Sequence, residues 1–394
     1  MTYAPSDGRR RLLFLVADAP FFVTHRLSLA RAARAAGYDV HVAVPFEDRP
    51  VASIRALGVH CHDIPLRRGN RALGGELRLI VALARLIGAL RPDLVHAVSL
   101  KPVIFGGLVA RLLGVPAAVL AVTGLGYLFL KPGARTAMQR AIIKRLYRFA
   151  LGHRRARAVF QNPDDLALFL REGLVDQAVT VMIKGCGVDT ACFRATPEPD
   201  GPVVVMFPAR VIGDKGVREF VAAAGILRRQ GVAARFVLVG RTDPENPTDV
   251  GELTIRGWEA TGDVEWWGFR EDMASVLAQA HVVCMPSYME GLPRVLIEAA
   301  ACARPVVTTD VPGCREIVRD GENGLLVPAR DGAATAVALG RLIADGALRA
   351  KLGARGREIA TSEFTVERFV GETLTLYRAL MPTHAARVIE GSRQ

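Results

Sequence analysis

The chain has 394 residues, which is enough for two domains of ordinary size. Hydrophobic residues make up 51% of it and charged residues 23%, a balance that excludes intrinsic disorder, collagen-like repeats and small disulfide-stapled scaffolds. The net charge of +12 is concentrated in residues 1–196, which hold 28 Lys/Arg against 13 Asp/Glu. A basic field of this size suits an anionic partner such as phospholipid, a phosphorylated substrate or nucleic acid.

The spacing of the cysteines and the apolar runs of the sequence indicate the cellular compartment in which the protein is expected. The six cysteines form no C-x-x-C pair, and no His/Cys group has the sequence spacing of a zinc site, so we expect a reducing compartment, buried thiols and no structural zinc. An apolar run follows Arg9-Arg10-Arg11 but ends at Asp18, too early for a signal peptide. The uncharged stretch Leu112–Leu130 is interrupted by glycine and proline, and we interpret it as a buried strand between loops rather than a membrane span.

Short runs rich in β-branched residues alternate with longer helical patterns through the first half of the chain. Such alternation predicts βαβ units and a mostly parallel sheet. The expected strands are Leu12–Ala17, Asp39–Val44, Val59–Ile64, Leu94–Val98, Ala117–Val122, Ala158–Gln161 and Val179–Ile183. The expected helices are Thr24–Ala36, Leu73–Leu90, Pro102–Leu113, Ala134–Leu151 and Pro163–Arg171.

A Pro-rich polar stretch at Thr196–Pro202 predicts a linker, and the alternation restarts after it. The expected strands are Val203–Pro208, Arg235–Gly240, Val264–Trp266, Val282–Met285, Pro305–Thr308 and Gly324–Val327. The expected helices are Lys215–Gln230, Asp272–Gln279, Leu292–Cys302 and several after Asp331. We therefore predict an α/β fold with two doubly wound, Rossmann-like domains, residues 1–196 and 203–381, facing each other across a cleft and followed by a tail at 382–394. Ligands of such folds bind at the carboxyl ends of the strands.

A loop that could hold a diphosphate follows the first strand of the second half. In Pro208–Gly216, backbone N–H groups at the positive end of a helix combine with the full charges of Arg210 and Lys215. Two cations offset most of the charge of a diphosphate, so the loop could clamp one without a metal ion. The alternative is a pair of solvated surface charges beside a turn.

A second constellation, Met285–Arg294, places Glu290 in a loop before a helix. Glu298 follows just over two helical turns later, so both carboxylates could point into one cleft and accept hydrogen bonds from sugar hydroxyls. If the helix starts at Leu292, the backbone N–H groups of Gly291 and Leu292 could bind phosphate or sugar oxygens. The alternative is that the glutamates merely offset the helix dipole.

These motifs resemble the retaining GT4-type glycosyltransferases. The residues that carry the resemblance are Ser287–Pro293, Glu298–Ala301, Pro305–Val307, Val311–Glu316, Asn323–Val327 and the Arg210/Lys215 loop. The resemblance implies a GT-B fold, a nucleotide-sugar donor (UDP-linked), retention of configuration, and no metal or other cofactor. It implies that Glu290 contacts the donor sugar, with Arg210 and Lys215 at its diphosphate as the other catalytic residues. The implied donor-binding residues are Glu298 at the ribose, Gly291, Leu292 and Pro293, with Gly268, Phe269 and Arg270 near the base.

The first half resembles a GT4 subgroup that builds bacterial surface polysaccharides on polyprenyl-diphosphate-linked acceptors. The matching segments are Phe21–Arg26, Lys101-Pro102 and Thr123–Tyr127. Two departures stand out: Ala19–Phe22 replaces a Gly-Gly loop, and Thr123 stands where many members have a histidine.

Four residues of the first half are candidates for binding acceptor or phosphate, namely His25, Lys101, Thr123 and Gly124. A capping or solvated role is the alternative for His25 and a solvated one for Lys101. His96 lies within an apolar strand, and we expect it to be a satisfied core group.

The basic stretch from Lys131 to Arg157 contains no acidic residue. On a helix, Arg140, Lys144 and Arg148 share one face, and Met138, Ile142, Leu146 and Phe149 line another. An ordinary amphipathic helix would bury the apolar face and wet the charges. The missing acidic residues favour contact with an anionic membrane, so we expect a cytoplasmic protein held peripherally at the inner face of the cytoplasmic membrane. Nucleic acid is disfavoured because no recognised fold motif accompanies the charges.

Three functions are compatible with these patterns. The leading one is a glycosyltransferase acting on a lipid-linked saccharide. A UDP-sugar 2-epimerase-like isomerase and a non-catalytic nucleotide-sugar or lipid-binding protein are the alternatives. The Glu290/Glu298 spacing and the Arg210/Lys215 pair favour the first over the isomerase, and the intact donor motifs favour it over the binding protein.

Overall fold

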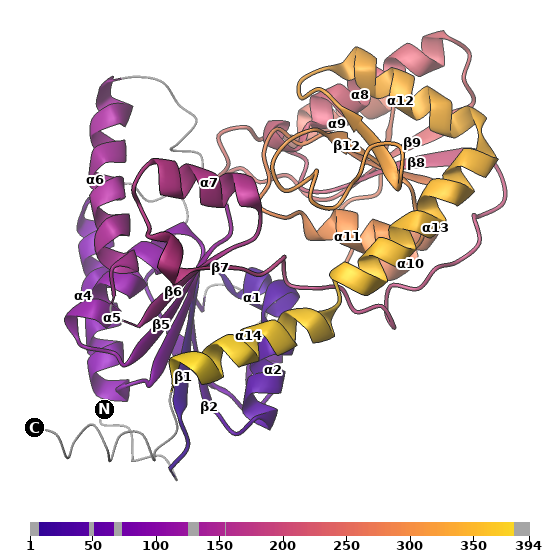
Figure 1. Ribbon diagram of the computed structural model, residues 1–394. Helices are drawn as coiled ribbons and strands as arrows, with labels where there is room; N and C mark the ends of the chain where they lie inside the picture. The colour runs from indigo at the N-terminus through magenta and orange to yellow at the C-terminus, as the bar shows by residue number, and fades with distance from the viewer. Residues whose placement is uncertain (1–7, 47–50, 67–72, 125–133, 154, 382–394) are drawn as a thin grey trace, which may run out of the picture. The chain divides into compact units, whose positions relative to one another are not determined.

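The computed structural model describes residues 8–46, 51–66, 73–124, 134–153 and 155–381. The chain folds into two compact units, each built on a parallel β-sheet with helices on its faces (Figure 1). The first unit contains the chain up to Lys184 and again from Phe369 onward, and the second contains Gly185–Arg368.

The first unit holds a seven-stranded parallel sheet in the order β3-β2-β1-β4-β5-β6-β7. Its central strands are buried along their whole length, as expected for a parallel sheet covered on both faces. The strands are β1 (Arg11–Val16), β2 (Asp39–Val44), β3 (His60–Asp63), β4 (Leu94–Val98), β5 (Ala117–Val122), β6 (Ala156–Phe160) and β7 (Thr180–Met182). The helices are α1 (Ala19–His25), α2 (Leu27–Ala35), α3 (Val51–Arg55), α4 (Leu73–Leu90), the π-helix η1 (Pro102–Gly106), α5 (Gly107–Leu112), α6 (Ala134–Leu151), α7 (Pro163–Arg171) and the 3-10 helix η3 (Gln177–Val179).

Most predicted elements of this unit are present, but the first helix is different. We predicted one helix from Thr24, whereas α1 begins at Ala19 and α2 follows after Arg26. The earlier start has a physical cause: the Asp18 carboxylate accepts a hydrogen bond from the Phe21 N–H at 2.7 Å and caps α1. The strand expected within Leu112–Leu130 is β5, which is buried; residues 125–130 lie outside the described part. Among the described helices, none combines the length and apolar character needed to cross a bilayer.

The second unit holds a six-stranded parallel sheet in the order β10-β9-β8-β11-β12-β13. A core of aliphatic and aromatic side chains packs between this sheet and its helices. One of these helices, α9, was not predicted from the sequence. The strands are β8 (Val203–Pro208), β9 (Ala234–Val239), β10 (Glu265–Trp266), β11 (Val282–Met285), β12 (Val306–Thr309) and β13 (Gly324–Val327). The helices are the 3-10 helix η4 (Gly213–Lys215), α8 (Val217–Arg229), α9 (Glu252–Ala260), α10 (Met273–Ala278), α11 (Arg294–Ala301), α12 (Gly332–Ala344) and α13 (Gly346–Glu363).

Helix α14 (Val366–Leu380) returns the chain to the first unit (Figure 1), where the Phe369 ring lies 5.2 Å from the Arg26 guanidinium carbon and Tyr377 packs edge-on against Tyr38. The Tyr377 hydroxyl is hydrogen-bonded to Nδ1 of His96, and both side chains are buried. His96 is thus a buried core group, as predicted, but only half of its ring is satisfied: Nδ1 has a partner, whereas Nε2 has no hydrogen-bond partner among the described residues. The predicted domain limits differ from these units, because residues 369–381 belong to the first unit. Residues 185–196 belong to the second, where the N–H of Val188 donates to the Phe364 carbonyl at 2.8 Å.

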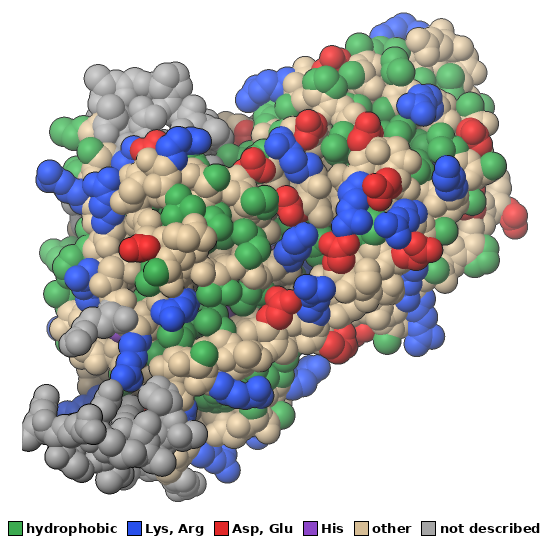
Figure 2. All heavy atoms as spheres, in the orientation of Figure 1, with side chains coloured by type: hydrophobic (Ala, Val, Ile, Leu, Met, Phe, Trp, Pro, Cys, Tyr) green, Lys and Arg blue, Asp and Glu red, His purple; other side chains and the backbone are tan. Residues whose placement is uncertain are grey.

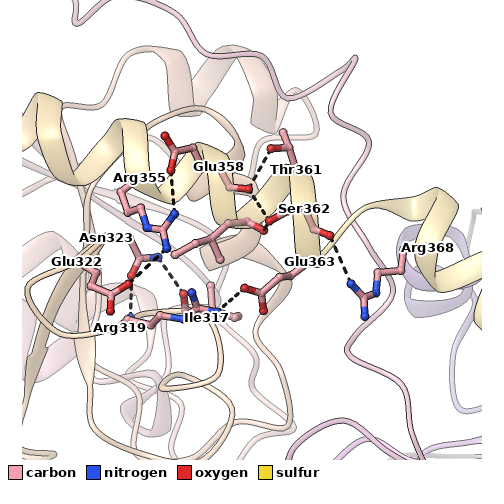
Figure 3. Close-up of polar contacts among 11 residues, drawn as sticks. Ile317, Arg319, Glu322, Asn323, Arg355, Glu358, Thr361, Ser362, Glu363 and Arg368 are labelled. Atoms are coloured by element: carbon pink, nitrogen blue, oxygen red, sulfur yellow. Dashed lines mark hydrogen bonds and ion pairs between the residues drawn. The ribbon is translucent and has the colours of Figure 1, made fainter.

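A polar network ties the turn after β12 to helix α13 (Figure 3). Arg319 forms an ion pair with Glu363 at the end of α13, and its backbone N–H donates to Oδ1 of Asn323 at 2.7 Å. The amide of the same asparagine donates to the Ile317 carbonyl at 2.9 Å from a buried position. The Asn323 side chain therefore forms hydrogen bonds with backbone groups of the turn itself. The ion pair between Arg319 and Glu363 joins the turn to α13, the helix that precedes α14.

Burial lowers the pKa of His96, and the nearby Arg26 guanidinium lowers it further. Below pH 6.5, the ordinary pKa of histidine, the unfolded chain therefore binds a proton at His96 that the folded chain does not bind. We expect the free energy of unfolding to fall as pH drops from 6.5, with His96 contributing up to about 1.4 kcal/mol per pH unit.

The variant His96→Gln keeps a hydrogen-bonding side chain but does not titrate. Thermal unfolding midpoints measured from pH 7 to pH 5 should fall less steeply in the variant. His153 and His281, whose pKa values are also lowered by burial, contribute equally to both proteins. Equal slopes would contradict the prediction.

Candidate functional site

The predicted donor residues of the second unit follow neighbouring parallel strands. Arg210 and Lys215 come after β8, Gly268 and Phe269 after β10, and Glu290 after β11. Because carboxyl ends of parallel strands meet at one edge of a sheet, these loops lie along the same edge. This edge is therefore the candidate site of the second unit.

Lys215 and Glu290 form an ion pair between two of these loops. The pair is largely shielded, with 20% of the Lys215 side chain and 10% of the Glu290 side chain exposed. Ser287 donates its hydroxyl to the same carboxylate oxygen at 2.6 Å, and Thr309 donates to the Ser287 carbonyl. The structure thus brings together two of the predicted catalytic residues and adds Ser287, which the sequence analysis did not single out.

Two glycines allow these loops to approach each other. Gly216 has φ +75°, and a Cβ atom there would overlap the carbonyl oxygen of Pro286. Gly313, with φ +80°, packs against the loop of Glu290, where a Cβ would lie 2.6 Å from the Gly291 carbonyl oxygen. Both positions require glycine, and both place backbone directly against the loop that carries Glu290.

Tyr288 also links the loop after β11 to the loop after β8. Its N–H donates to the Asp214 carbonyl at 2.9 Å, and its hydroxyl donates to Glu219 at 2.6 Å. The Arg330 guanidinium carbon lies 4.1 Å from the centre of the tyrosine ring. Burial and the Glu219 carboxylate raise the pKa of Tyr288 to about 12, so it stays a hydrogen-bond donor at neutral pH.

Arg210 pairs with Asp243 in the loop after β9, and 42% of its side chain is exposed. At the next strand, Phe269 is 58% exposed, and the Arg241 guanidinium carbon lies 5.3 Å from its ring centre. Arg270 forms a bidentate pair with Asp272 at 2.6 and 2.8 Å. The edge thus presents two cations at β8, each paired with a carboxylate, and one exposed aromatic ring beside β10.

Helix α11 begins at Arg294, two residues after the start we considered, so Gly291, Leu292 and Pro293 lie in the loop before it. Glu298 lies in its second turn, buried, with Oε1 2.8 Å from Nε of Arg294. Burial raises the pKa of Glu298, and the Arg294 charge opposes that rise.

In the first unit, Lys101, Thr123 and Gly124 come after the adjacent strands β4 and β5, whereas His25 is the last residue of α1, the helix that follows β1. The His25 ring stacks on Phe21 at 4.1 Å between centres, and Lys101 Nζ lies 2.9 Å from Glu76 Oε1. Thr123 donates to the Ser99 hydroxyl at 3.4 Å, and Gly124 follows it with φ +139°. Leu125–Tyr127 of the same motif lie outside the described residues.

Two cations of helix α6 contact other protein groups, whereas the amphipathic pattern predicted that they would face solvent. Lys144 forms an ion pair with Glu172, and Arg148 donates to the Gly173 and Glu172 carbonyls just beyond α7. The apolar residues Met138, Ile142 and Phe149, which we expected an ordinary amphipathic helix to bury, are 64%, 53% and 36% exposed. The Arg140 side chain lies outside the described part of the chain.

Comparisons with known proteins agree with the fold and the motifs. Residues 202–345 match the family model of group 1 glycosyl transferases, and residues 11–161 match that of glycosyl transferase 4-like proteins. The N,N'-diacetylbacillosaminyl-diphospho-undecaprenol alpha-1,3-N-acetylgalactosaminyltransferase of Campylobacter jejuni is 27% identical over 83% of this chain and 88% of its own.

Solved structures show the same fold. The sucrose-phosphate synthase of Thermosynechococcus elongatus matches with a TM-score of 0.78 and 22% identity, over 94% of this chain and 99% of its own. HepE of Anabaena in complex with UDP and glucose matches with a TM-score of 0.73 and 19% identity, over 93% of this chain and 100% of its own. The two parallel-sheet units therefore define a GT-B fold.

The chain belongs to the GT4-like, group 1 glycosyltransferases. This family match favours a glycosyltransferase over the isomerase and the non-catalytic binding protein that the sequence also allowed.

The contact between Gly216 and Pro286 can be tested by Gly216→Ala. The new Cβ would overlap the Pro286 carbonyl, so the β8 and β11 loops must separate. Gly251→Ala is a matched control, because Gly251 has φ +73° but no atom within 4 Å of the position that a Cβ would take. We expect Gly216→Ala to lower the free energy of unfolding by about 1–3 kcal/mol more than the control. Equal losses in thermal or denaturant unfolding would mean that the loops do not depend on this contact.

Proposed function

We propose that this glycosyltransferase moves a sugar from a UDP-sugar to a lipid-linked saccharide, with retention of configuration, in the synthesis of a bacterial surface glycan. The observation that carries the proposal is the Lys215–Glu290 pair, held by Ser287 at the carboxyl edge of the second sheet. The Campylobacter relative, named for a diphospho-undecaprenol acceptor, supports the acceptor class.

The donor half of the proposal rests on charge. Arg210 and Lys215 bind the diphosphate, each exchanging the carboxylate that it now contacts for a phosphate oxygen. Glu290, released from Lys215, accepts hydrogen bonds from the donor sugar, and Glu298 accepts them from the ribose. The exposed ring of Phe269, near Gly268 and Arg270, stacks on the base.

Backbone groups add to these contacts. The N–H groups of Gly291 and Leu292, just before Pro293, precede the positive end of α11, where phosphate and sugar oxygens bind favourably. Two cations and this helix end supply the charge that a divalent metal would otherwise provide, so we propose that transfer needs no cofactor.

For the chemical step, we propose departure and attack on the same face of the sugar. The bond from the anomeric carbon to the β-phosphate oxygen breaks, and its electron pair stays on the phosphate, stabilised by Arg210 and Lys215. The acceptor hydroxyl forms the new bond from that face and passes its proton to the departing phosphate oxygen. Retention follows without a covalent enzyme intermediate.

The acceptor side uses the corresponding edge of the first unit. His25, Lys101, Thr123 and Gly124 follow three adjacent strands there and supply donors for the diphosphate and saccharide of the acceptor. Lys101 must exchange Glu76 for a phosphate oxygen, as Arg210 and Lys215 exchange their own carboxylates.

An anionic membrane surface is the proposed site of action for a cytoplasmic, peripheral enzyme. Met138, Ile142 and Phe149 form an exposed apolar stripe on α6, and Leu112, at the end of α5, is 66% exposed. The Arg111 guanidinium carbon lies 4.3 Å from the Phe149 ring centre. Figure 2 shows hydrophobic and basic side chains interspersed along the margin where α6 lies. Apolar residues beside cations suit insertion among anionic headgroups, to which Arg140, Lys144 and Arg148 add charge.

The catalytic role of Lys215 predicts that Lys215→Ala lowers turnover by about 100-fold or more, because a cation at the leaving diphosphate is lost. The assay is UDP release from a panel of UDP-sugars, with and without a polyprenyl-diphosphate-linked saccharide, and NMR of the product gives its anomeric configuration. Release that requires the lipid-linked saccharide is the expected result.

The matched control is Lys351→Ala, which removes an exposed lysine from α13 in the same unit. Its turnover should equal that of the wild type. Near-normal turnover of a folded Lys215→Ala protein would exclude the assigned role, and an inverted product would exclude the same-face mechanism.

The proposed membrane surface predicts that Ile142→Gln with Leu112→Gln weakens binding to vesicles that contain anionic lipid. Each substitution removes an exposed apolar side chain worth about 1.5–3 kcal/mol on full burial, so the pair should weaken partitioning at least tenfold. Leu253→Gln with Val337→Gln is the control, since these residues are 90% and 68% exposed on the second unit. Vesicle sedimentation should separate the two pairs; equal binding would rule out this surface.

A further inference from the structure

A cluster of three histidines and one aspartate lies at the edge of the sheet in the first unit. Asp39 and His41 belong to β2, and His60 and His62 belong to the edge strand β3. The parallel register pairs His41 with His60 and Ala43 with His62, so all four polar side chains emerge on one face of the sheet. No role in sugar transfer has been assigned to these residues.

The distances within the cluster fit the first coordination shell of a small cation. Nε2 of His41 lies 3.2 Å from Oδ2 of Asp39, and Nε2 of His60 lies 3.5 Å from Oδ1. The ligand atoms of these three residues all lie within 4.8 Å of one another. Four ligands at about 2.0–2.1 Å around a tetrahedral ion stand roughly 3.3 Å apart, so only small movements are needed to close this shell.

We propose that Asp39, His41 and His60 form a binding site for Zn²⁺, with water as the fourth ligand. Two imidazole nitrogens and one carboxylate are a donor set that zinc accepts. The side chain of His60 is 62% exposed, whereas that of His41 is 3% exposed, so the ion enters from solvent and the exposed ring closes over it.

His62 orients the buried ligand from behind. Its Nε2 lies 2.9 Å from Nδ1 of His41, so a proton on Nδ1 is donated to His62 and leaves Nε2 of His41 as a lone pair facing the ion. In the metal-free protein the opposite tautomer fits, with a proton on Nε2 of His41 3.2 Å from Oδ2 of Asp39 and His62 donating to Nδ1. Metal binding therefore shifts protons between His41 and His62, and the exposed ring of His60 makes the small movement that closes the shell.

The position of the cluster assigns the ion a structural role. Asp39 and His60 are the first residues of their strands, whereas the acceptor candidates follow the carboxyl ends of β1, β4 and β5. An ion shared by β2 and β3 fastens the edge strand to the sheet. Arg11, whose Nε lies 3.8 Å from Oδ2 of Asp39, opposes the cation and weakens its binding.

The test uses the full chain, free of any histidine tag, titrated with Co²⁺ and then competed with Zn²⁺. Visible absorption of tetrahedral Co²⁺ should saturate at one equivalent and disappear as Zn²⁺ is added. His60→Ala should abolish it, and the exposure of that side chain makes the substitution tolerable to the fold. His62→Ala should weaken binding by about tenfold or more through the lost orientation of His41.

The control is His25→Ala, which removes a histidine from helix α1, outside the cluster, and should bind the metal normally. Zn²⁺ should also raise the thermal unfolding midpoint of the wild type but not that of His60→Ala. Failure of the wild type to bind Co²⁺, or equal binding by His60→Ala, would overturn the site. Undiminished binding by His62→Ala would overturn its orienting role. Neither readout depends on sugar transfer.

Discussion

The candidate donor site depends on the contact between Gly216 and the carbonyl of Pro286. Only a residue without Cβ allows the loop after β8 to lie directly on the loop after β11. Because the loops touch there, Lys215 reaches Glu290, and Tyr288 reaches back to Asp214. Gly313 repeats the arrangement from the loop after β12. Three loops separated in sequence thus become one surface, and the network around Arg319 and Asn323 holds the third in place.

This packing brings acidic and basic groups together at the edge where we propose that the diphosphate binds. Lys215 and Arg210 each have a carboxylate partner in the structure, so neither charge is left uncompensated without a donor. Ser287 donates a hydrogen bond to the Glu290 carboxylate, and Thr309 donates one to the Ser287 carbonyl, so the loop of Glu290 has contacts besides the ion pair. In our proposal, binding is an exchange of partners, which costs less than desolvating a free cation.

Much of this arrangement could be predicted from the sequence, because parallel strands and glycine-rich loops leave local signals. The strands and the positions of Arg210, Lys215 and Glu290 followed from periodicity and motif order, whereas the linker predicted at Thr196–Pro202 lies inside the second unit. Partners such as Asp243 and Glu219 could not be found, since their contacts join segments that are distant in sequence. The return of α14 was hidden for the same reason: an amphipathic helix does not reveal which core it covers.

The histidine cluster shows the same limit more clearly. His41 and His60 belong to different strands, and a parallel register, rather than a short sequence motif, brings them opposite each other. Spacing rules for zinc sites detect ligands that are close in sequence and so pass over such a pair. On α6, too, contacts between distant segments were hidden from the sequence: Lys144 and Arg148 contact the segment after α7, and Met138, Ile142 and Phe149 are exposed while Leu146 packs against the core.

The return of α14 also bears on how the protein is made. The buried partner of His96 is Tyr377, which follows the second unit in the chain, so the core of the first unit lacks this side chain until the second unit and α14 have been synthesised. The second unit, Gly185–Arg368, is complete before that point. Since domains fold as units during synthesis, the second unit can reach its native state first. The first unit can complete its core only after α14 has been synthesised.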